Sequence, residues 1–295
     1  MQWFTYFSLF LFWAVFGSFG SLLIWRLKWD INKQTLKWIF FWRSECPKCN
    51  NTLWALDLVP IFSWIFLGGK CRHCKAKISS YYPFLELCSG IVFMFSYRFV
   101  ARYLRYDDFS NIYFLTNFVN FAFINWVLLL LFFADILFFE LNVVLWTILV
   151  LWIMFFQFFW FVWNFKVATI WWVVFFVLFY AIYLFSKFYV KMRFGKDATE
   201  GFGEWDVMVW FVIWLLMPFL LDYTQFDTLN IIYISFFYLL LSSILWLVFS
   251  VFSLIFNKWK YWKAIPFLPA MIVWFWILCV FISNIRHFLF SNFIY

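Results

Sequence analysis

Long apolar runs occupy most of this 295-residue chain, and they constrain its fold more than any other feature. Hydrophobic residues make up 67% of the sequence and charged residues only 12%, whereas soluble domains are about 45–50% apolar and about 25% charged. A soluble fold of this size cannot bury so much apolar surface, so most of that surface must face lipid. The composition therefore predicts an all-α polytopic membrane protein.

Crossing the hydrocarbon core of a bilayer takes about 20 predominantly apolar residues. The first such segment is long, uninterrupted and not preceded by a charged region, so we expect a membrane helix rather than a cleaved signal peptide. Eight segments have the required length and composition: 3–25, 82–104, 112–134, 142–164, 168–186, 206–222, 229–256 and 264–285.

Basic residues gather in three of the connecting segments. Segment 26–80 contains ten basic residues against three acidic ones, segment 187–205 contains four basic residues, and the segment after the seventh span contains three. Eight alternating spans put these three loops on one side of the membrane, and basic loops face the cytoplasm. We therefore expect a multi-pass protein of the cytoplasmic (inner) membrane. This topology also accounts for the net charge of +8 without a nucleic-acid partner.

The long polar loop contains two Cys-x-x-Cys pairs, Cys46–Cys49 and Cys71–Cys74, which are separated by 21 residues. Each pair places two thiolates on one tight turn, and two such pairs complete a tetrahedral zinc site. His73 lies inside the second pair, but four cysteines already supply a full set of ligands. The expected cytoplasmic location favours metal binding over disulfides. The loop is too small for a large core, so a metal is the expected way to stabilise it.

Acidic residues at the edges of membrane spans are the candidates for chemistry. Asp135 ends the third span and Asp206 begins the sixth, so the predicted topology places both at the cytoplasmic boundary. Two carboxylates at one depth can share a proton and activate a water molecule. The alternative for each, and for Glu86 at the start of the second span, is an interfacial acid without a catalytic role. Gly201 and Gly203 precede Asp206 and permit close backbone approach, which favours a site there.

Six segments, in order along the chain, resemble the bacterial type IV prepilin peptidases, which are membrane aspartic proteases of the GxGD type. An unrelated membrane protein with a zinc-ribbon docking module would not contain this ordered series. The resemblance implies cleavage of the basic leader from type IV prepilins or pseudopilins at the cytoplasmic face. It also implies N-methylation of the new N-terminal residue with S-adenosylmethionine. The segments are Gly17–Leu27, Arg43–Cys49, Asp57–Ser63, Gly69–Cys74, Ile78–Glu86 and Ile265–Pro269.

The resemblance assigns roles to particular positions. Asp135 matches the first catalytic aspartate of the family, and Asp206 matches the aspartate of its GxGD motif. The four cysteines match the zinc ligands of the module linked to methylation. The implied organisation is a first membrane helix over 1–25, a cytoplasmic zinc module over 26–81 and a transmembrane peptidase domain over 82–295.

One departure affects the expected catalytic turn. The motif reads Gly203-Glu204-Trp205-Asp206, with Trp205 where the family has glycine. A bulky side chain there obstructs the substrate backbone, which favours an inactive homologue that binds prepilins as a membrane scaffold. A second explanation is a UGA codon, which some bacteria read as glycine. The chain has only 8 glycines against 23 tryptophans, and Trp42 and Trp214 also stand where the family has glycine. UGG codons at these positions would exclude this explanation.

Overall fold

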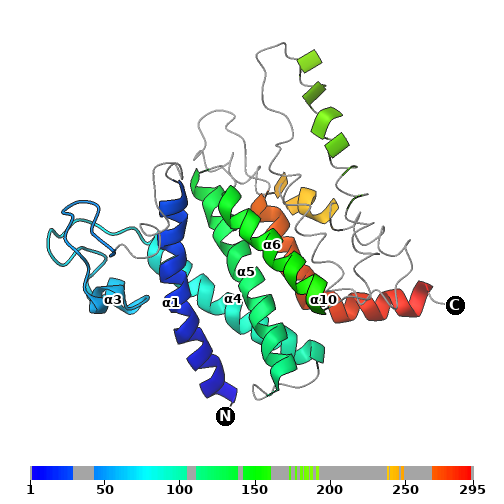
Figure 1. The fold of residues 1–295 in the computed structure, drawn as a ribbon, viewed down its shortest axis with the longest axis horizontal. Coiled ribbons are helices and arrows are strands. Elements are labelled where there is room, and N and C mark those ends of the chain that lie inside the picture. Colours follow the sequence, from blue (N-terminus) through cyan, green and yellow to red (C-terminus); the bar gives the residue numbers. More distant parts are fainter. Residues whose placement is uncertain are drawn as a thin grey trace. The chain divides into compact units, whose positions relative to one another are not determined.

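The computed structural model describes residues 2–28, 43–104, 111–138, 142–160 and 268–293 as continuous segments. It also describes scattered positions between 173 and 192 and between 238 and 248. These residues contain helices and two isolated β-bridges but no named strand, as the all-α prediction requires. The elements are α1 (Gln2–Lys28), the 3-10 turn η2 (Ala55–Leu58), α3 (Phe62–Phe66), α4 (Tyr81–Leu104), α5 (Ile112–Phe138), α6 (Val143–Trp160) and α10 (Leu268–Phe293) (Figure 1).

Three of the described helices are long and apolar enough to cross a membrane: Phe7–Leu27, Tyr81–Arg102 and Ile112–Phe138. They coincide with the first three spans expected from the sequence. Two shorter apolar helices, Val143–Phe156 and Leu268–Phe281, lie within the fourth and eighth expected spans. The spans expected over 168–186, 206–222 and 229–256 fall wholly or largely outside the described residues, so the count of eight stays a prediction.

The chain divides into two compact units, of which the first comprises Met1–Ala134 and Asn142–Leu145. In this unit α1 and α4 are antiparallel, because Gly17 lies against Glu86 while Trp13 lies further along α4 against Phe93. The rings of Trp13 and Phe93 are stacked, with centroids 3.7 Å apart. A Cβ atom on Gly17 would lie 2.6 Å from the Glu86 Cα, so glycine permits this close approach of the two backbones.

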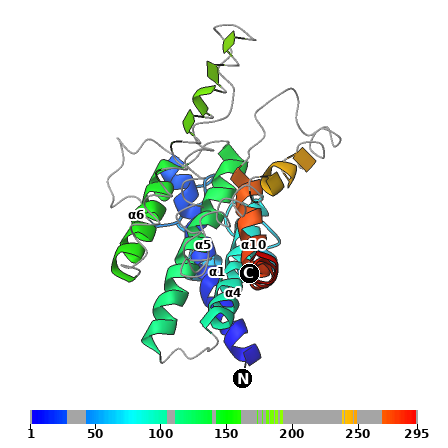
Figure 2. The same cartoon turned by 90° about the vertical axis from the view of Figure 1, so that its right-hand side faces the viewer.

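Helix α5 completes the bundle and packs on both α1 and α4 (Figure 2). The Trp126 indole N–H donates to the Phe16 carbonyl of α1 at 3.2 Å. On the other side, the Phe121 ring stacks on Phe99 of α4 with centroids 4.4 Å apart. Buried amides supply polar contacts inside the bundle, as when Asn125 donates to the Ser96 hydroxyl at 3.3 Å. Such interhelical hydrogen bonds help membrane helices associate without a hydrophobic driving force.

The helix directions bring three helix termini to one end of this bundle. Helix α5 is antiparallel to α4, because its late residue Phe133 contacts Tyr81 and Phe84 in the first turn of α4. The end of α1, the start of α4 and the turn of α5 around Phe133 therefore lie at the same end. The loop that contains the cysteines joins α1 to α4 and emerges at that end, as the predicted topology requires.

Candidate functional site

The two cysteine pairs fold into turns with the same hydrogen bonds. In the first turn the Cys46 N–H donates to the Asn51 carbonyl at 3.0 Å, and the Asn50 N–H donates to the Cys46 carbonyl at 2.8 Å. The second turn has the same two bonds around Cys71. Its N–H donates to the carbonyl five residues later at 2.8 Å, and its carbonyl accepts from the N–H four residues later at 3.1 Å. The residue after each second cysteine has a positive φ, 54° at Asn50 and 56° at Lys75. Two knuckles of one geometry thus face each other.

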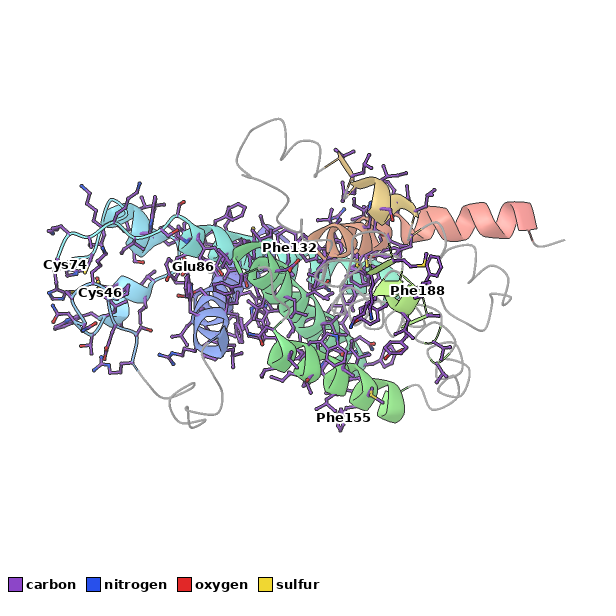
Figure 3. All side chains as sticks on the ribbon, turned by 90° about the horizontal axis from the view of Figure 1, so that it is seen from above. Cys46, Cys74, Glu86, Phe132, Phe155 and Phe188 are labelled. Atoms are coloured by element: carbon purple, nitrogen blue, oxygen red, sulfur yellow. The ribbon has the colours of Figure 1, made fainter. Side chains whose placement is uncertain are left out.

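The four cysteine sulfur atoms converge within 4.8 Å of one another, although Cys46 and Cys74 are 28 positions apart in sequence. The Sγ atoms of Cys46 and Cys74 are 3.8 Å apart (Figure 3). Zinc–sulfur bonds of about 2.3 Å in a tetrahedron place two sulfur atoms about 3.8 Å apart. The described cysteines of this loop are free thiols rather than disulfides. The cluster can therefore hold a metal ion, and its geometry fits zinc.

The protein lowers the pKa of one thiol in this cluster and raises that of another. The backbone N–H groups of Cys74 and His73 are the main reasons why the pKa of Cys71 falls to about 7. The N–H of Ala76 has the same effect on Cys74, but burial and the neighbouring thiols outweigh it and raise that pKa to about 11. Cys71 is thus the more readily ionised of the two, and thiolates are the form that binds metal.

An ion pair ties the second knuckle to the segment that precedes it. Asp57 Oδ1 accepts from Arg72 Nε at 2.9 Å and lies 2.7 Å from the second guanidinium nitrogen. The other carboxylate oxygen accepts from the Trp54 N–H at 3.3 Å. The Asp57 side chain is only 3% exposed, whereas Arg72 is half exposed. This partly buried pair ties the chain between the two knuckles to the second knuckle of the cysteine cluster.

Glu86 connects the cysteine loop to the membrane helices. Its Oε2 atom accepts from the Ile61 N–H at 2.6 Å, and the Ser18 side chain of α1 donates to the same carboxylate. Glu86 itself is buried in the second turn of α4. Figure 3 shows Glu86 between the cysteine loop and the helices. One carboxylate thus joins α1, α4 and the loop.

Ile61 reaches this carboxylate through a strained turn. The Phe62 N–H donates to the Pro60 carbonyl at 2.6 Å, and Ile61 between them has φ 64° and ψ −54°. These values describe a γ-turn of the positive-φ type, which is rare and strained, and a β-branched residue is especially unsuited to it. Backbone strain of about 1–3 kcal/mol persists only where the surroundings impose the conformation. The hydrogen bond to Glu86 is such a constraint.

The structure places only some of the residues expected at the peptidase site. Asp135 is buried in the last turn of α5, two residues after Phe133, which contacts the start of α4. Asp206, Gly201 and Gly203 lie outside the described residues, so the pairing of the two aspartates stays a prediction.

Sequence reasoning did not identify Ile61, nor the pairing of Asp57 with Arg72. A signal for the ion pair was available, because Asp57 is the only charged residue between Lys48 and Lys70. A lone charge in an apolar stretch needs a partner. The turn at Ile61 had no such signal, because isoleucine is among the least expected residues at positive φ.

Residues 11–100 match the family model of the bacterial peptidase A24 N-terminal domain. The matched region contains most of α1, the complete four-cysteine cluster and most of α4. The resemblance to type IV prepilin peptidases seen in the sequence is thereby confirmed for this domain.

Named relatives agree with this assignment. The chain is 34% identical over 92 residues to a "Type 4 prepilin-like proteins leader peptide-processing enzyme" of Escherichia coli, covering 27% of this chain and 34% of the relative. It is 43% identical over 83 residues to a "Prepilin leader peptidase/N-methyltransferase" of Vibrio cholerae, covering 26% and 32%. A protein of the same name from Burkholderia pseudomallei is 50% identical over 48 residues, which is 16% of either chain.

These alignments cover about a third of the relatives' length or less. No solved structure matches the chain.

Proposed function

We propose that this protein removes the leader peptide from type IV prepilins or pseudopilins. The observation that carries the proposal is an A24 N-terminal domain with an assembled four-cysteine cluster, in a chain whose relatives are named prepilin peptidases. Its substrates have an apolar helix next to the leader, and an enzyme with apolar membrane helices can receive that helix laterally from the bilayer. The membrane helices of the enzyme and the apolar helix of the substrate would therefore both contact membrane lipid.

Asp135 and Asp206 are the proposed catalytic pair. One carboxylate, ionised, takes a proton from water while the other, protonated, donates a proton to the scissile carbonyl. Like charges at one site favour this unequal protonation, because a second negative charge is disfavoured beside the first. Two features support the role of Asp135: it is buried, and it lies in the last turn of α5. Hydrolysis by this route forms no covalent acyl-enzyme.

We further propose that Cys46, Cys49, Cys71 and Cys74 hold zinc and that their module supports N-methylation of the new pilin N-terminus. The ion would fix the two knuckles relative to each other, since so small a module has little apolar core of its own. S-adenosylmethionine is the proposed methyl donor, consumed as a co-substrate. The word N-methyltransferase in the names of the Vibrio and Burkholderia relatives supports this second activity.

The proposed architecture has eight membrane helices, with the module over 26–81 and both aspartates facing the cytoplasm. The peptidase domain extends over 82–295. This architecture is supported by the basic composition of loop 26–80 and by the direction of α5, whose Phe133 lies against the start of α4. Basic loops remain on the cytoplasmic side of the inner membrane.

Trp205 favours a second candidate function. A tryptophan immediately before Asp206 would crowd the position where a substrate backbone must approach the carboxylate. In that case the chain would bind prepilins without cutting them and would act as a membrane scaffold. The metal module and the prepilin surface would be retained in both alternatives, and only turnover would differ.

Cleavage of a prepilin in isolated membranes tests the proposal. The chain as written is compared with Trp205→Gly and Asp206→Ala variants, and with Asp108→Asn as a control outside the proposed site. The peptidase is supported if the unmodified chain removes the leader, the Asp206→Ala variant does not, and the Asp108→Asn variant does. Cleavage only by Trp205→Gly would identify Trp205 as the block. No cleavage by any variant, with zinc still bound, would overturn the peptidase in favour of the scaffold.

A further inference from the structure

The segment between the two knuckles is apolar and exposes its apolar side chains. Residues 49–69 contain a single charged residue, Asp57. Leu56 is 70% exposed and Phe66 is 84% exposed, which is unusual for large side chains in a folded module. The other large apolar side chains exposed here are Trp54, Leu58, Val59, Phe62 and Ile65. We call residues 54–66 the apolar segment.

The apolar segment exposes apolar side chains and buries its charge, whereas a surface that faces water does the reverse. Its one carboxylate, on Asp57, is turned inward against Arg72 and is 3% exposed. In α3, Trp64 is the side chain that faces the module, since its indole N–H donates to the Ile78 carbonyl at 3.2 Å. Its neighbours Ile65 and Phe66 are exposed instead. An apolar surface with its charge sequestered marks contact with an apolar phase or partner.

The hydrogen bond to Glu86 fixes the depth of this segment relative to the membrane helices. Glu86 is five residues beyond Tyr81, where α4 begins, which is about 7–8 Å along a helix. The Ile61 N–H lies 2.6 Å from the Glu86 carboxylate, so α3 starts level with the first turns of a helix that can cross a membrane. Phe84 and Ile91 of α4 are also exposed, so the helix that holds the apolar segment exposes apolar side chains as well.

Exposed lysines flank the apolar segment in sequence. Lys48 precedes it, and Lys70, Lys75 and Lys77 follow it. Amphipathic elements that lie in the membrane interface combine large apolar side chains with lysines that contact anionic headgroups. We propose that residues 54–66 insert into the cytoplasmic leaflet, with Leu56, Phe62, Ile65 and Phe66 at the boundary between headgroups and acyl chains. The cysteine module is then seated on an anionic phospholipid surface instead of projecting freely into the cytoplasm.

This anchoring requires only the membrane helices and does not depend on the peptidase activity. It also has a consequence for the metal cluster, because Asp57 and Arg72 connect the inserted segment to the second knuckle. The height of the cysteine cluster above the bilayer is then set by two attachments. One is the hydrogen bond between Ile61 and Glu86, and the other is the insertion of Phe66 and its neighbours.

Depth-dependent fluorescence quenching tests the proposal. An environment-sensitive fluorescent amino acid replaces Phe66 in the full chain, which is reconstituted in phosphatidylcholine–phosphatidylglycerol vesicles with nitroxide lipids labelled near the headgroup or deep in the acyl chain. The same fluorophore at Glu45, an exposed acidic position on the first knuckle, is the control. Bound zinc, measured in both proteins, verifies that the module is folded.

We expect the shallow nitroxide to quench the fluorophore at position 66 several-fold more than at position 45, and the deep nitroxide to quench less. Equal quenching at the two positions would overturn the proposal. A fluorophore at position 66 that is unquenched by lipid, but shifts to shorter wavelength when a prepilin is added, would also overturn it. That result would assign the apolar segment to the substrate helix instead of the bilayer.

Discussion

The Glu86 carboxylate accepts the backbone N–H of Ile61 at 2.6 Å and thereby connects a membrane helix to a loop 25 residues earlier in the chain. Ile61 occupies a positive-φ γ-turn that few β-branched residues adopt. Glu86 stands in the second turn of α4, directly against Gly17 of α1. The relationship makes the position of the cysteine module depend on one buried acceptor.

Removing that acceptor should loosen the module without unfolding the helices. In Glu86→Ala the Ile61 amide loses its hydrogen-bond acceptor, and leaving a buried N–H unsatisfied typically costs about 1–3 kcal/mol. We expect hydrogen exchange at residues 60–63 to accelerate at least tenfold, measured by mass spectrometry on the reconstituted protein. Glu86→Gln keeps a carbonyl acceptor and should show a smaller effect. Unchanged exchange in Glu86→Ala would contradict the role given to this contact.

The contact between α1 and α4 at Gly17 should not tolerate even one added carbon. A Cβ atom there would meet the Glu86 backbone at 2.6 Å and the Ser89 side chain at 2.9 Å. Because backbone cannot yield as a side-chain end does, Gly17→Ala should cost about 1–3 kcal/mol of stability and lower the thermal unfolding midpoint in detergent. The matched control Ser8→Ala, at an exposed position of the same helix, should leave the midpoint unchanged. Equal midpoints in the two variants would refute the packing argument.

The second knuckle should be stabilised by glycine at one position only. Lys75 has φ 56°, where a side chain is strained and glycine is not. Lys75→Gly should therefore strengthen zinc binding against a competing chelator by a few-fold. Lys77 pairs with Lys70 in an isolated antiparallel β-bridge, so Lys77→Gly should weaken zinc binding. Opposite results for the pair would show that backbone strain does not limit this turn.

Acidification should release the metal in two regimes. Metal binding requires thiolates, so every thiol that is protonated at the working pH must lose its proton. The pKa of Cys71 is about 7 and that of Cys74 about 11, so Cys74 releases a proton throughout the neutral range and Cys71 only below pH 7. The slope of log zinc affinity against pH should thus be about one unit steeper below pH 7 than above it. A constant slope between pH 6 and pH 8, measured by chelator competition, would contradict these ionisations.

The sequence was sufficient to predict the metal cluster and the first three spans, because both depend on patterns local to the chain. The Cys-x-x-Cys pairs close tight turns by themselves, and apolar runs of about 20 residues specify membrane helices. The hydrogen bond between the Ile61 N–H and the Glu86 carboxylate was not predictable. It depends on the α1–α4 approach at Gly17, which no periodicity encodes, and on a conformation that isoleucine ordinarily avoids. The exposure of the apolar segment could not be predicted from the sequence either, because it depends on how the loop docks on the helices.

Prepilin processing by this chain can be read directly from the mass of the pilin N-terminus. Membranes that contain the chain are incubated with a prepilin in the presence and absence of S-adenosylmethionine, beside the Asp135→Asn variant. We expect the pilin to lose its leader and to gain one methyl group only when S-adenosylmethionine is present. With Asp135→Asn we expect the prepilin to stay uncut. A prepilin that copurifies with the chain but retains its full mass in every sample would contradict prepilin processing and favour the membrane scaffold.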